Sequence, residues 1–308
     1  MIGLMRNKVK LCDHDPRWES EAERTISVLK SVLGGVAVDI RHVGSTSVRS
    51  IKAKPIIDIA VAVTDFRALL ELKDALSERG IHYRQAIDAS GEIIPPPVDF
   101  STVRQLLFAC GSYCDGTGNI QTHFIHAALE NSTEFENYIN FRDFLASHPR
   151  DAEAYEALKI SLAEKYPNDR LSYTLGKDAL INRIFEKIRA RSYLGKTVDI
   201  IVDRPLGSTH PTDSGIVYPI NYGYIPNTRA GDGEPIDVYI LDENKSIESC
   251  RARIIAVVYR SDDEEDKLIA AIGGADFSRD EIKGYIDFQE RYFDTELELA
   301  RDYRRRSE

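Results

Sequence analysis

Cysteine is scarce in this sequence. Its 308 residues include four cysteines, at positions 12, 110, 114 and 250. Four thiols in a chain of this length do not make a disulfide framework. Cys110 and Cys114 have no second pair that would complete a zinc site. We therefore expect reduced thiols with a structural role.

Long apolar runs and excess positive charge are also missing. No run approaches the roughly 20 apolar residues that a membrane span needs, and the first residues lack the pattern of a secretion signal. We expect a soluble, cytoplasmic protein. The net charge of −10 opposes binding to bulk nucleic acid. The basic end at Arg304–Arg306 is interpreted as a solvated helix end.

The patterns that are present indicate two domains, 1–191 and 192–308. Apolar residues make up 43% and charged residues 29% of the chain, which is typical of globular proteins. In the first domain, periodicity predicts helices and strands in alternation, followed by a helical end that opens with a capping signal at Asn131 and Glu134. The expected strands are 36–43, 55–63, 103–109 and 122–127, and the expected helices are 18–33, 65–79, 131 onward, 150–165 and 171–189. This order predicts a mixed α/β sheet.

Short strands separated by turn residues dominate the second domain. They are expected at 197–204, 216–225, 235–241, 252–260 and 267–272. Several short strands at this spacing predict a closed β-barrel. A last helix is expected to begin at the capping box of Ser278 and Glu281 and to carry Tyr292 and Phe293. The fold class is therefore predicted to be α+β.

An acidic turn lies in the middle of the second domain. Asp232, Glu234 and Asp237 fall within six residues, and the intervening Gly233 and Pro235 favour a tight turn. Crowded carboxylates repel one another unless a cation sits among them, and Mg²⁺ takes oxygen ligands of this kind. Surface acidic turns are common, so the turn alone leaves metal binding open. A second acidic run at 262–266 could supply further ligands.

The segment Tyr218–Tyr224, which precedes the acidic turn, resembles the hallmark segment of the family I soluble inorganic pyrophosphatases. In that family it runs into an Asp-Gly-Asp-Pro-x-Asp motif. The resemblance implies Mg²⁺ as cofactor and a small phosphorylated substrate, pyrophosphate or a nucleotide. The implied metal ligands are Asp232, Glu234, Asp237, Asp262 and Asp263.

The same resemblance implies roles for residues that act on the substrate. Glu234 stands where an aspartate acts as general base, Tyr222 lies near the attacked phosphate, and Lys267 and Arg204 hold phosphate. Tyr218 and Tyr292 are the implied pocket residues. The sequence departs from the family at Phe293, where a lysine is usual, and it lacks the Lys-x-Glu strand. His210 could replace a lost phosphate contact or be an ordinary loop histidine.

Three activities remain open for the second domain. Mg²⁺ can lower the pKa of an attacking water and neutralise phosphoryl charge, while a carboxylate accepts the proton. The domain could hydrolyse pyrophosphate in this way, or hydrolyse a related phosphoanhydride. The alternative is a noncatalytic sensor that binds nucleotides or diphosphates.

The first domain resembles the GrpB family, whose fold belongs with the nucleotidyltransferases. The resemblance covers residues 8–188 and includes Arg41–Val48, Ala53–Ile59 and Thr122–His126. Gly44 and Ser45 form a turn that can expose backbone N–H groups to a phosphate, and Asp58 on the next strand could hold Mg²⁺. Lys54 is a candidate phosphate contact.

The position two residues after Asp58 is Ala60, where active nucleotidyltransferases usually carry a second carboxylate. Nucleotide binding or nucleotidyl transfer is therefore the expectation for this domain, and transfer would release pyrophosphate for the second domain. His123 and His126 are three apart on a strand and should point to opposite faces. An oligomer is possible.

Overall fold

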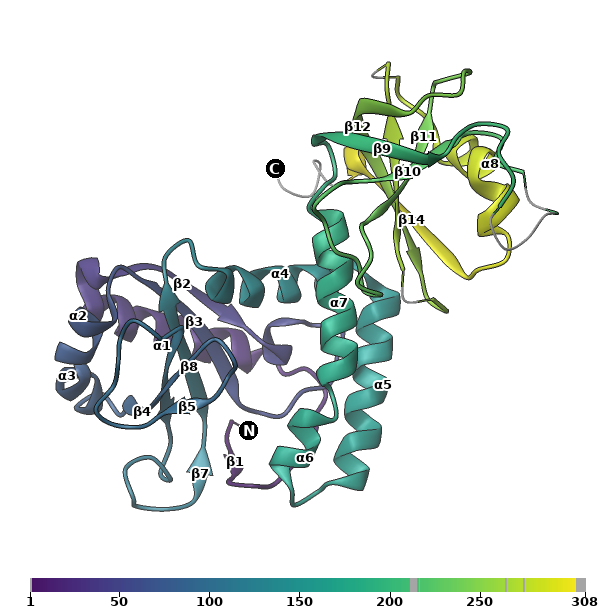
Figure 1. The fold of residues 1–308 in the computed structure, drawn as a ribbon. Coiled ribbons are helices and arrows are strands. Elements are labelled where there is room, and N and C mark those ends of the chain that lie inside the picture. Colours follow the sequence, from purple (N-terminus) through teal and green to yellow (C-terminus); the bar gives the residue numbers. More distant parts are fainter. Residues whose placement is uncertain (1, 211–214, 216, 264, 274, 303–308) are drawn as a thin grey trace. The chain divides into compact units, whose positions relative to one another are not determined.

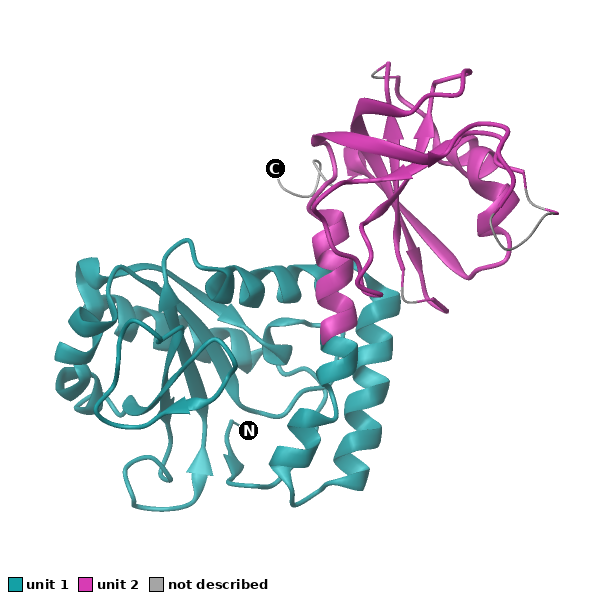
Figure 2. Ribbon diagram, viewed as in Figure 1, with its two compact units in different colours: residues 1–181 teal, residues 182–308 magenta. Residues whose placement is uncertain are grey.

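The computed structural model describes residues 2–210, 215, 217–263, 265–273 and 275–302. It divides into two compact units, residues 1–181 and 182–308 (Figure 2). The expected boundary near residue 192 lies just after the helix α7 (Asp178–Arg191) and stays a prediction. Glu264 and the basic end at Arg304–Arg306 lie outside the described residues.

The first unit is built on a six-stranded mixed sheet in the order β2-β3-β8-β6-β4-β5 (Figure 1). Its central pair, β3 and β8, is parallel, and β2 and β6 flank this pair in antiparallel directions. The strands are β2 (Ala37–Val43), β3 (Ile57–Val63), β4 (His82–Ile87), β5 (Ile93–Ile94), β6 (Gln105–Cys110) and β8 (His123–Leu129). A separate two-stranded sheet joins β1 (Leu4–Met5) to β7 (Ile120–Gln121).

Helices cover both faces of this sheet. Successive side chains of a strand point to opposite faces, so Ile57, Ile59 and Val61 pack with Trp18 and Leu29 of α1 on one face. On the other face Ala60 and Ala62 pack against Phe135 of α4. The helices and 3-10 turns are α1 (Arg17–Leu33), η1 (Gly34–Val36), η2 (Ser45–Ser47), α2 (Phe66–Glu71), α3 (Lys73–Ser77), α4 (Thr133–Ser147), α5 (Pro149–Lys165), α6 (Arg170–Leu175) and α7. Asp58 therefore shares the face of β3 that meets α4.

The second unit is a closed five-stranded barrel. Its strands follow the order β13-β11-β10-β9-β12, and a further pairing of β12 with β13 closes the ring. They are β9 (Thr197–Arg204), β10 (Asn221–Tyr224), β11 (Asp237–Leu241), β12 (Ser249–Arg260) and β13 (Lys267–Ala271). A sixth strand, β14 (Thr295–Leu299), pairs with β12. The helix α8 (Arg279–Glu290) places Ile282 and Ile286 in the barrel core.

The predicted fold class is confirmed: an α+β chain with a mixed sheet and a helical end, then a barrel with a late helix. The capping box at Ser278 and Glu281 is also confirmed, because both of its hydrogen bonds are present. Among the described residues, none of the helices combines the length and the apolar character that crossing a membrane requires.

Several local predictions were wrong. The helix α4 is capped by the side chain of Ser132, which accepts from the backbone N–H of Phe135 at 3.3 Å, and not by Asn131. Asn131 instead takes a left-handed conformation, φ 59°, one residue earlier. The helix α8 ends at Glu290, so Tyr292 and Phe293 follow it in a turn. The strands β1, β4, β5, β7 and β14 were not predicted.

Candidate active site

Strand register gathers the chemistry-bearing side chains of the second unit at one end of the barrel. Tyr222 of β10 pairs with Arg204 of β9, and Tyr224 pairs with Asp237 of β11. The strand β11 runs parallel to β13, with Val238 beside Leu268, so Asp237 and Lys267 begin neighbouring strands together. Residues that are far apart in the sequence therefore meet at a single site.

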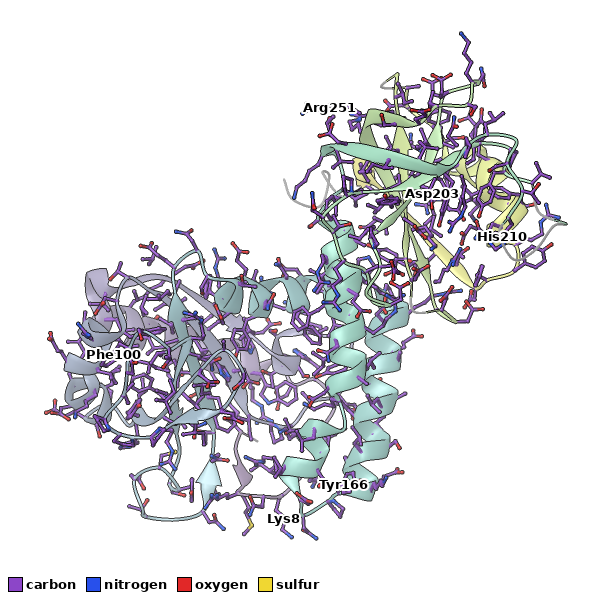
Figure 3. The ribbon with its side chains drawn as sticks, in the orientation of Figure 1. Lys8, Phe100, Tyr166, Asp203, His210 and Arg251 are labelled. Atoms are coloured by element: carbon purple, nitrogen blue, oxygen red, sulfur yellow. The ribbon has the colours of Figure 1, made fainter. Side chains whose placement is uncertain are left out.

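These side chains line a cleft of about 500 Å³. Asp203 and His210, which both line it, are labelled in Figure 3. The full lining is Asp203, Arg204, His210, Tyr222, Tyr224, Asp232, Glu234, Pro235, Asp237, Arg260, Glu265, Lys267 and Gln289. The cleft thus brings together the acidic turn, Tyr222, Lys267 and Arg204.

Asp237 is the centre of the hydrogen bonds in this cleft. Its Oδ2 accepts from the Lys267 ammonium at 2.5 Å and also from the Tyr222 hydroxyl. Burial, together with the nearby Asp237 carboxylate, raises the pKa of Tyr222 well above its usual value, so the hydroxyl stays protonated and donates. Arg204 lies over the Tyr222 ring, with Cζ 5.0 Å from the ring centroid.

Glu265 joins this arrangement from the second acidic run. Its carboxylate pairs with Lys267, and it is also hydrogen-bonded to Asp232. Burial and the Asp232 contact raise the pKa of Glu265. Burial by itself would raise the pKa of Asp232, but hydrogen bonds from Glu265 and from the Glu234 N–H lower it on balance.

The charge of the cleft is negative. Five carboxylates line it, at positions 203, 232, 234, 237 and 265, against the three cations Arg204, Arg260 and Lys267. An anionic phosphate entering this cleft needs additional positive charge, and carboxylate oxygens are ligands that suit a hard divalent cation. The donor set therefore fits Mg²⁺ in its chemistry. No three acidic, histidine or cysteine side chains among the described residues are already arranged as a metal-binding group.

Four residues expected at the site lie outside the cleft lining. Tyr218 is fully buried behind it, with its ring 5.4 Å from that of Tyr222. Tyr292 is 66% exposed in the turn after α8. Asp262 accepts from the Asp294 backbone N–H at 3.0 Å, and Asp263 pairs with Arg260 at 2.8 Å. The structure thus brings Glu265, and not the Asp262–Asp263 pair, to the acidic turn.

Arg260 is a cleft residue that sequence reasoning missed. Its guanidinium is buried and pairs with the carboxylates of Glu290, at 2.6 Å, and Asp263. These two carboxylates neutralise its charge. The Cζ of Arg260 lies 3.7 Å from the centroid of the Phe293 ring. Phe293 is the residue that stands where a lysine is usual in the pyrophosphatase family. The available signal was a charged residue that ends the otherwise uncharged run 254–260.

Gly44 and Asp58, two of the predicted site residues of the first unit, lie against each other. Gly44 has φ 69°, and a Cβ placed there would lie 2.5 Å from Asp58 Oδ2, so only glycine allows this approach. His126 Nε2 lies 3.3 Å from Asp58 Oδ1. Gln105 Nε2 lies 2.8 Å from the other ring nitrogen, Nδ1. Because an amide nitrogen can only donate, Nδ1 accepts, and the proton on Nε2 faces Asp58.

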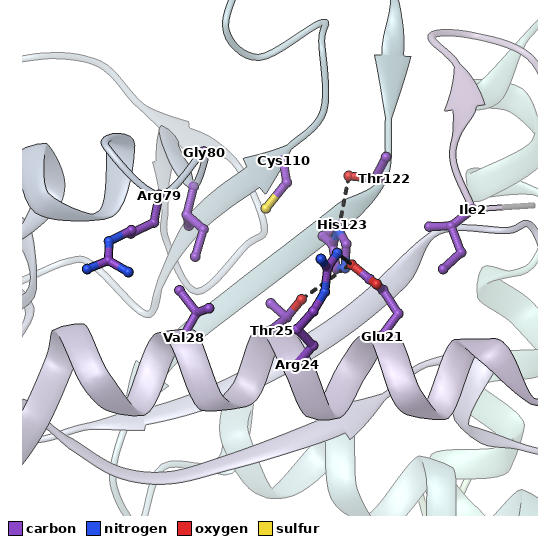
Figure 4. Close-up of a pocket in the computed structure, with 11 residues that line it drawn as sticks. Ile2, Glu21, Arg24, Thr25, Val28, Arg79, Gly80, Cys110, Thr122 and His123 are labelled. Atoms are coloured by element: carbon purple, nitrogen blue, oxygen red, sulfur yellow. Dashed lines mark hydrogen bonds and ion pairs between the residues drawn. The ribbon is translucent and has the colours of Figure 1, made fainter.

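His123 points to the other face of β8, as the spacing predicted. It lines a cleft of about 470 Å³ (Figure 4), and Asp58 is not part of the lining of this cleft. Its ring nitrogens bond to Thr25 at 3.2 Å and to Thr122 at 2.9 Å, and Glu21 lies 3.6 Å away. Burial lowers the pKa of His123, so it is neutral and satisfied.

A model of the GrpB protein family matches residues 8–187, which is more than half of the sequence. This chain belongs to the GrpB family. It is 30% identical over 189 residues to the glutamate-rich protein GrpB of Alkalihalophilus pseudofirmus, covering 61% of this chain and 100% of that relative. The crystal structure of the conserved protein GrpB from Enterococcus faecalis covers 60% of this chain and 99% of its own, with 25% identity and a TM-score of 0.50.

The sequence that follows the GrpB unit matches the inorganic pyrophosphatase family model over residues 196–304. The soluble inorganic pyrophosphatase of Oryza sativa subsp. indica is 33% identical over 138 residues, which is 41% of this chain. The chain spans 62% of that relative's length. The predicted fusion is therefore confirmed: a GrpB unit precedes a unit of the pyrophosphatase type.

Proposed function

We propose that the second unit hydrolyses inorganic pyrophosphate with Mg²⁺ as its cofactor. The observation that carries this proposal is the cleft that joins Asp232, Glu234 and Asp237 to Lys267 and Tyr222. The match of this unit to the inorganic pyrophosphatase family supports the same reaction class. The excess of carboxylates supports the requirement for a divalent cation.

The residues of the cleft divide the work of the reaction between them. A water molecule attacks one phosphorus atom, the bond from that phosphorus to the bridging oxygen breaks, and the proton of the water passes to Glu234. Lys267 and Arg204 hold phosphoryl oxygens by charge-assisted hydrogen bonds. Tyr222 fixes the orientation of Asp237 through its hydroxyl. Two phosphates then leave the cleft.

Asp232, Glu234 and Asp237, with Glu265 beside them, are the residues that would hold Mg²⁺. The bound ion supplies a lower pKa for the attacking water and neutralises charge on the substrate. Lys267 now pairs with Asp237 and Glu265. With a cation held by those carboxylates, the Lys267 ammonium would be available to a phosphoryl oxygen of the substrate.

The proposal is tested by phosphate release from pyrophosphate in full-length protein and two matched variants. Asp237→Asn removes a charge at the centre of the cleft and is expected to lower kcat/KM by about 100-fold or more. Asp199→Asn is the control, because Asp199 is 77% exposed on β9 and has only a 3.9 Å contact to Arg251. Equal activity of the wild type and Asp237→Asn would overturn the proposal.

The alternative of a noncatalytic sensor is separated by the same preparation. A sensor would bind pyrophosphate and show no Mg²⁺-dependent turnover of pyrophosphate or of nucleoside di- and triphosphates. Turnover of a nucleotide but not of pyrophosphate would keep the hydrolase and change its substrate.

For the GrpB unit, nucleotide binding and nucleotidyl transfer stay predictions. The close approach of Gly44 to Asp58 favours them. The next residue on the same face of β3 is Ala60, which is fully buried against Val43 and Phe135 and offers no second carboxylate. A two-metal transfer reaction therefore lacks one of its usual ligands in β3.

A further inference from the structure

Four cations converge in the GrpB unit at the side of the sheet where Asp58 lies. Lys54 precedes β3, Lys159 belongs to α5, Arg170 begins α6, and Lys177 lies between α6 and α7. The ammonium nitrogens of Lys54 and Lys177 each lie 5.0 Å from the centroid of the same buried ring, Tyr173. We call these four residues the cationic cluster.

Carboxylates do not balance the cationic cluster. Within the described part of the chain, Lys54 and Lys177 make no ion pair within 4 Å, and both remain partly exposed. Lys159 is 1% exposed, and its ammonium donates to Ser45 Oγ at 3.3 Å and to the Lys52 carbonyl, which are neutral acceptors. Arg170 likewise donates to an amide and to backbone carbonyls.

Asp58 is the carboxylate that acts on Lys54, Arg170 and Lys177 together. Asp58 also lies against His126, with 3.3 Å between Asp58 Oδ1 and His126 Nε2. Glu156 also acts on Lys159 and Asp178 acts on Lys177, while Arg6 adds a positive charge beside Arg170, so cations still outnumber carboxylates at the cationic cluster. Holding several like charges in a partly dry environment is costly unless a counter-charge enters.

The burial and mutual repulsion of these cations lower the pKa values of the lysines. Burial, and then the charges of Lys177 and Arg170, lower the pKa of Lys54 to about 7. Burial lowers the pKa of Lys159 to about 7, against the opposing effect of Glu156. An anion bound between these groups would return both to their charged form.

We propose that the GrpB unit binds the phosphate group of a small molecule at the cationic cluster, without a metal ion, through Lys54 and Lys177. This goes beyond pyrophosphate hydrolysis, because it concerns the other unit. Lys159 and Arg170 add further positive charge to the site. Ser45 adjoins the site because its hydroxyl accepts a hydrogen bond from Lys159. The lysines supply the charge that metal ions supply in two-carboxylate sites.

A phosphate monoester suits this site better than other anions. Its doubly charged tetrahedral group accepts from several ammonium donors at once, whereas a carboxylate offers one charge and two oxygens. The net charge of −10 disfavours a long nucleic acid. The ligand class is therefore a small phosphorylated metabolite.

The test uses full-length protein in EDTA, with inorganic phosphate, AMP and ATP as probes and adenosine as the uncharged control. Trp18 is the only tryptophan and is buried in the GrpB unit, so its fluorescence follows the melting of that unit alone. At least one phosphate probe is expected to raise the melting temperature, and adenosine is not. Stabilisation by AMP or ATP but not by inorganic phosphate would identify a nucleotide as the ligand.

Lys54→Met and Lys177→Met are the informative variants, because methionine keeps an apolar stem and removes the charge. Each is expected to weaken binding of the phosphate probe roughly 10- to 100-fold. Without ligand, each is expected to melt at a higher temperature than the wild type, since a buried repulsion is removed. A lysine with a purely structural role would instead lower the melting temperature.

Two controls assign the effect to the cationic cluster. Lys73→Met changes an exposed lysine of α3, and Lys267→Met removes the lysine of the barrel cleft. Both are expected to keep the wild-type response of Trp18. The proposal is overturned if no phosphate probe stabilises the GrpB unit in EDTA, or if the Lys54→Met Lys177→Met double variant binds as the wild type does.

Discussion

Tyr222 illustrates how one side chain connects the barrel core to the cleft. Its ring is buried among Tyr218 and Tyr239, and its hydroxyl donates to Asp237. Burial raises its pKa, so the hydroxyl remains a donor throughout the pH range of most enzyme assays. The residue therefore serves both packing and the orientation of a carboxylate.

The variant Tyr222→Phe separates these two roles. The ring is kept, so we expect the barrel to fold with a loss of about 1 kcal/mol. Asp237 loses one of its two donors, so kcat for pyrophosphate should fall about tenfold or more while KM changes less. Steady-state phosphate release checks this, with Tyr285→Phe, an exposed position on α8, as the control. An unchanged kcat would remove Tyr222 from the site.

The lysines of the cationic cluster predict how the stability of the GrpB unit depends on pH. The folded-state pKa of Lys54 and of Lys159 is about 7, below the ordinary value of 10.5 that applies when the chain unfolds. The unfolded chain binds more protons above pH 7, so the free energy of unfolding rises with pH. Each lysine contributes up to about 1.4 kcal/mol per pH unit.

Urea unfolding followed by Trp18 fluorescence from pH 7 to about pH 9 measures this slope. The slope is expected to be smaller in Lys54→Met and unchanged in Lys73→Met. Above this range Tyr155 opposes the trend. Burial raises the pKa of its hydroxyl to about 12 in the folded protein. The unfolded chain therefore loses this proton at a lower pH than the folded chain does, and the free energy of unfolding falls as the pH rises. A flat or falling profile in the wild type would contradict the assigned burial of these lysines.

Local motifs were predictable from the sequence, and distant partners were not. Asp232, Glu234 and Asp237 stand within one turn, so their proximity follows from the chain itself. Glu265 reaches them only because β11 and β13 run parallel. The contact of Arg260 with Glu290 and the contacts of the cationic cluster join elements that are far apart in the sequence, so local patterns do not show which residues meet.

At the scale of elements, signals at the start of a helix were more informative than strand patterns. The Ser278 capping box was read correctly, because its two hydrogen bonds depend on residues three apart. The strand β14 was missed because Glu296 and Glu298 interrupt its apolar residues. Glu298 is nevertheless buried, and it is held by Arg191 at 3.0 Å and by the Tyr259 hydroxyl at 2.8 Å. A buried strand that contains a paired charged residue lacks the apolar pattern from which strands are predicted.

The capping box gives a prediction for the barrel unit. Ser278→Ala removes the acceptor for the Glu281 N–H and is expected to destabilise the unit by about 1 kcal/mol. Ser246→Ala, in an exposed loop, is the control and should change stability by less than about 0.5 kcal/mol. Denaturation followed by circular dichroism measures the change, and the Trp18 transition should not move. Equal stability of both variants would show that the cap is dispensable.

At the scale of the whole molecule, two units with candidate sites of opposite charge share one chain. The barrel cleft is acidic and suits a metal-dependent reaction, whereas the cationic cluster of the GrpB unit supplies positive charge from lysine and arginine side chains. The fusion was predictable because each unit carries its own local motifs. Cytoplasmic location, oligomeric state and nucleotidyl transfer stay predictions, because the geometry of these two sites does not test them.

The most direct measurement is phosphate release from pyrophosphate by the full-length protein, with Mg²⁺ and with excess EDTA. Because carboxylates outnumber cations in the cleft, the anionic substrate requires added positive charge, and turnover is predicted only with Mg²⁺. It should be lost in Asp237→Asn and kept in Asp199→Asn. Absence of Mg²⁺-dependent turnover in the folded wild-type protein would contradict the proposed hydrolysis of pyrophosphate.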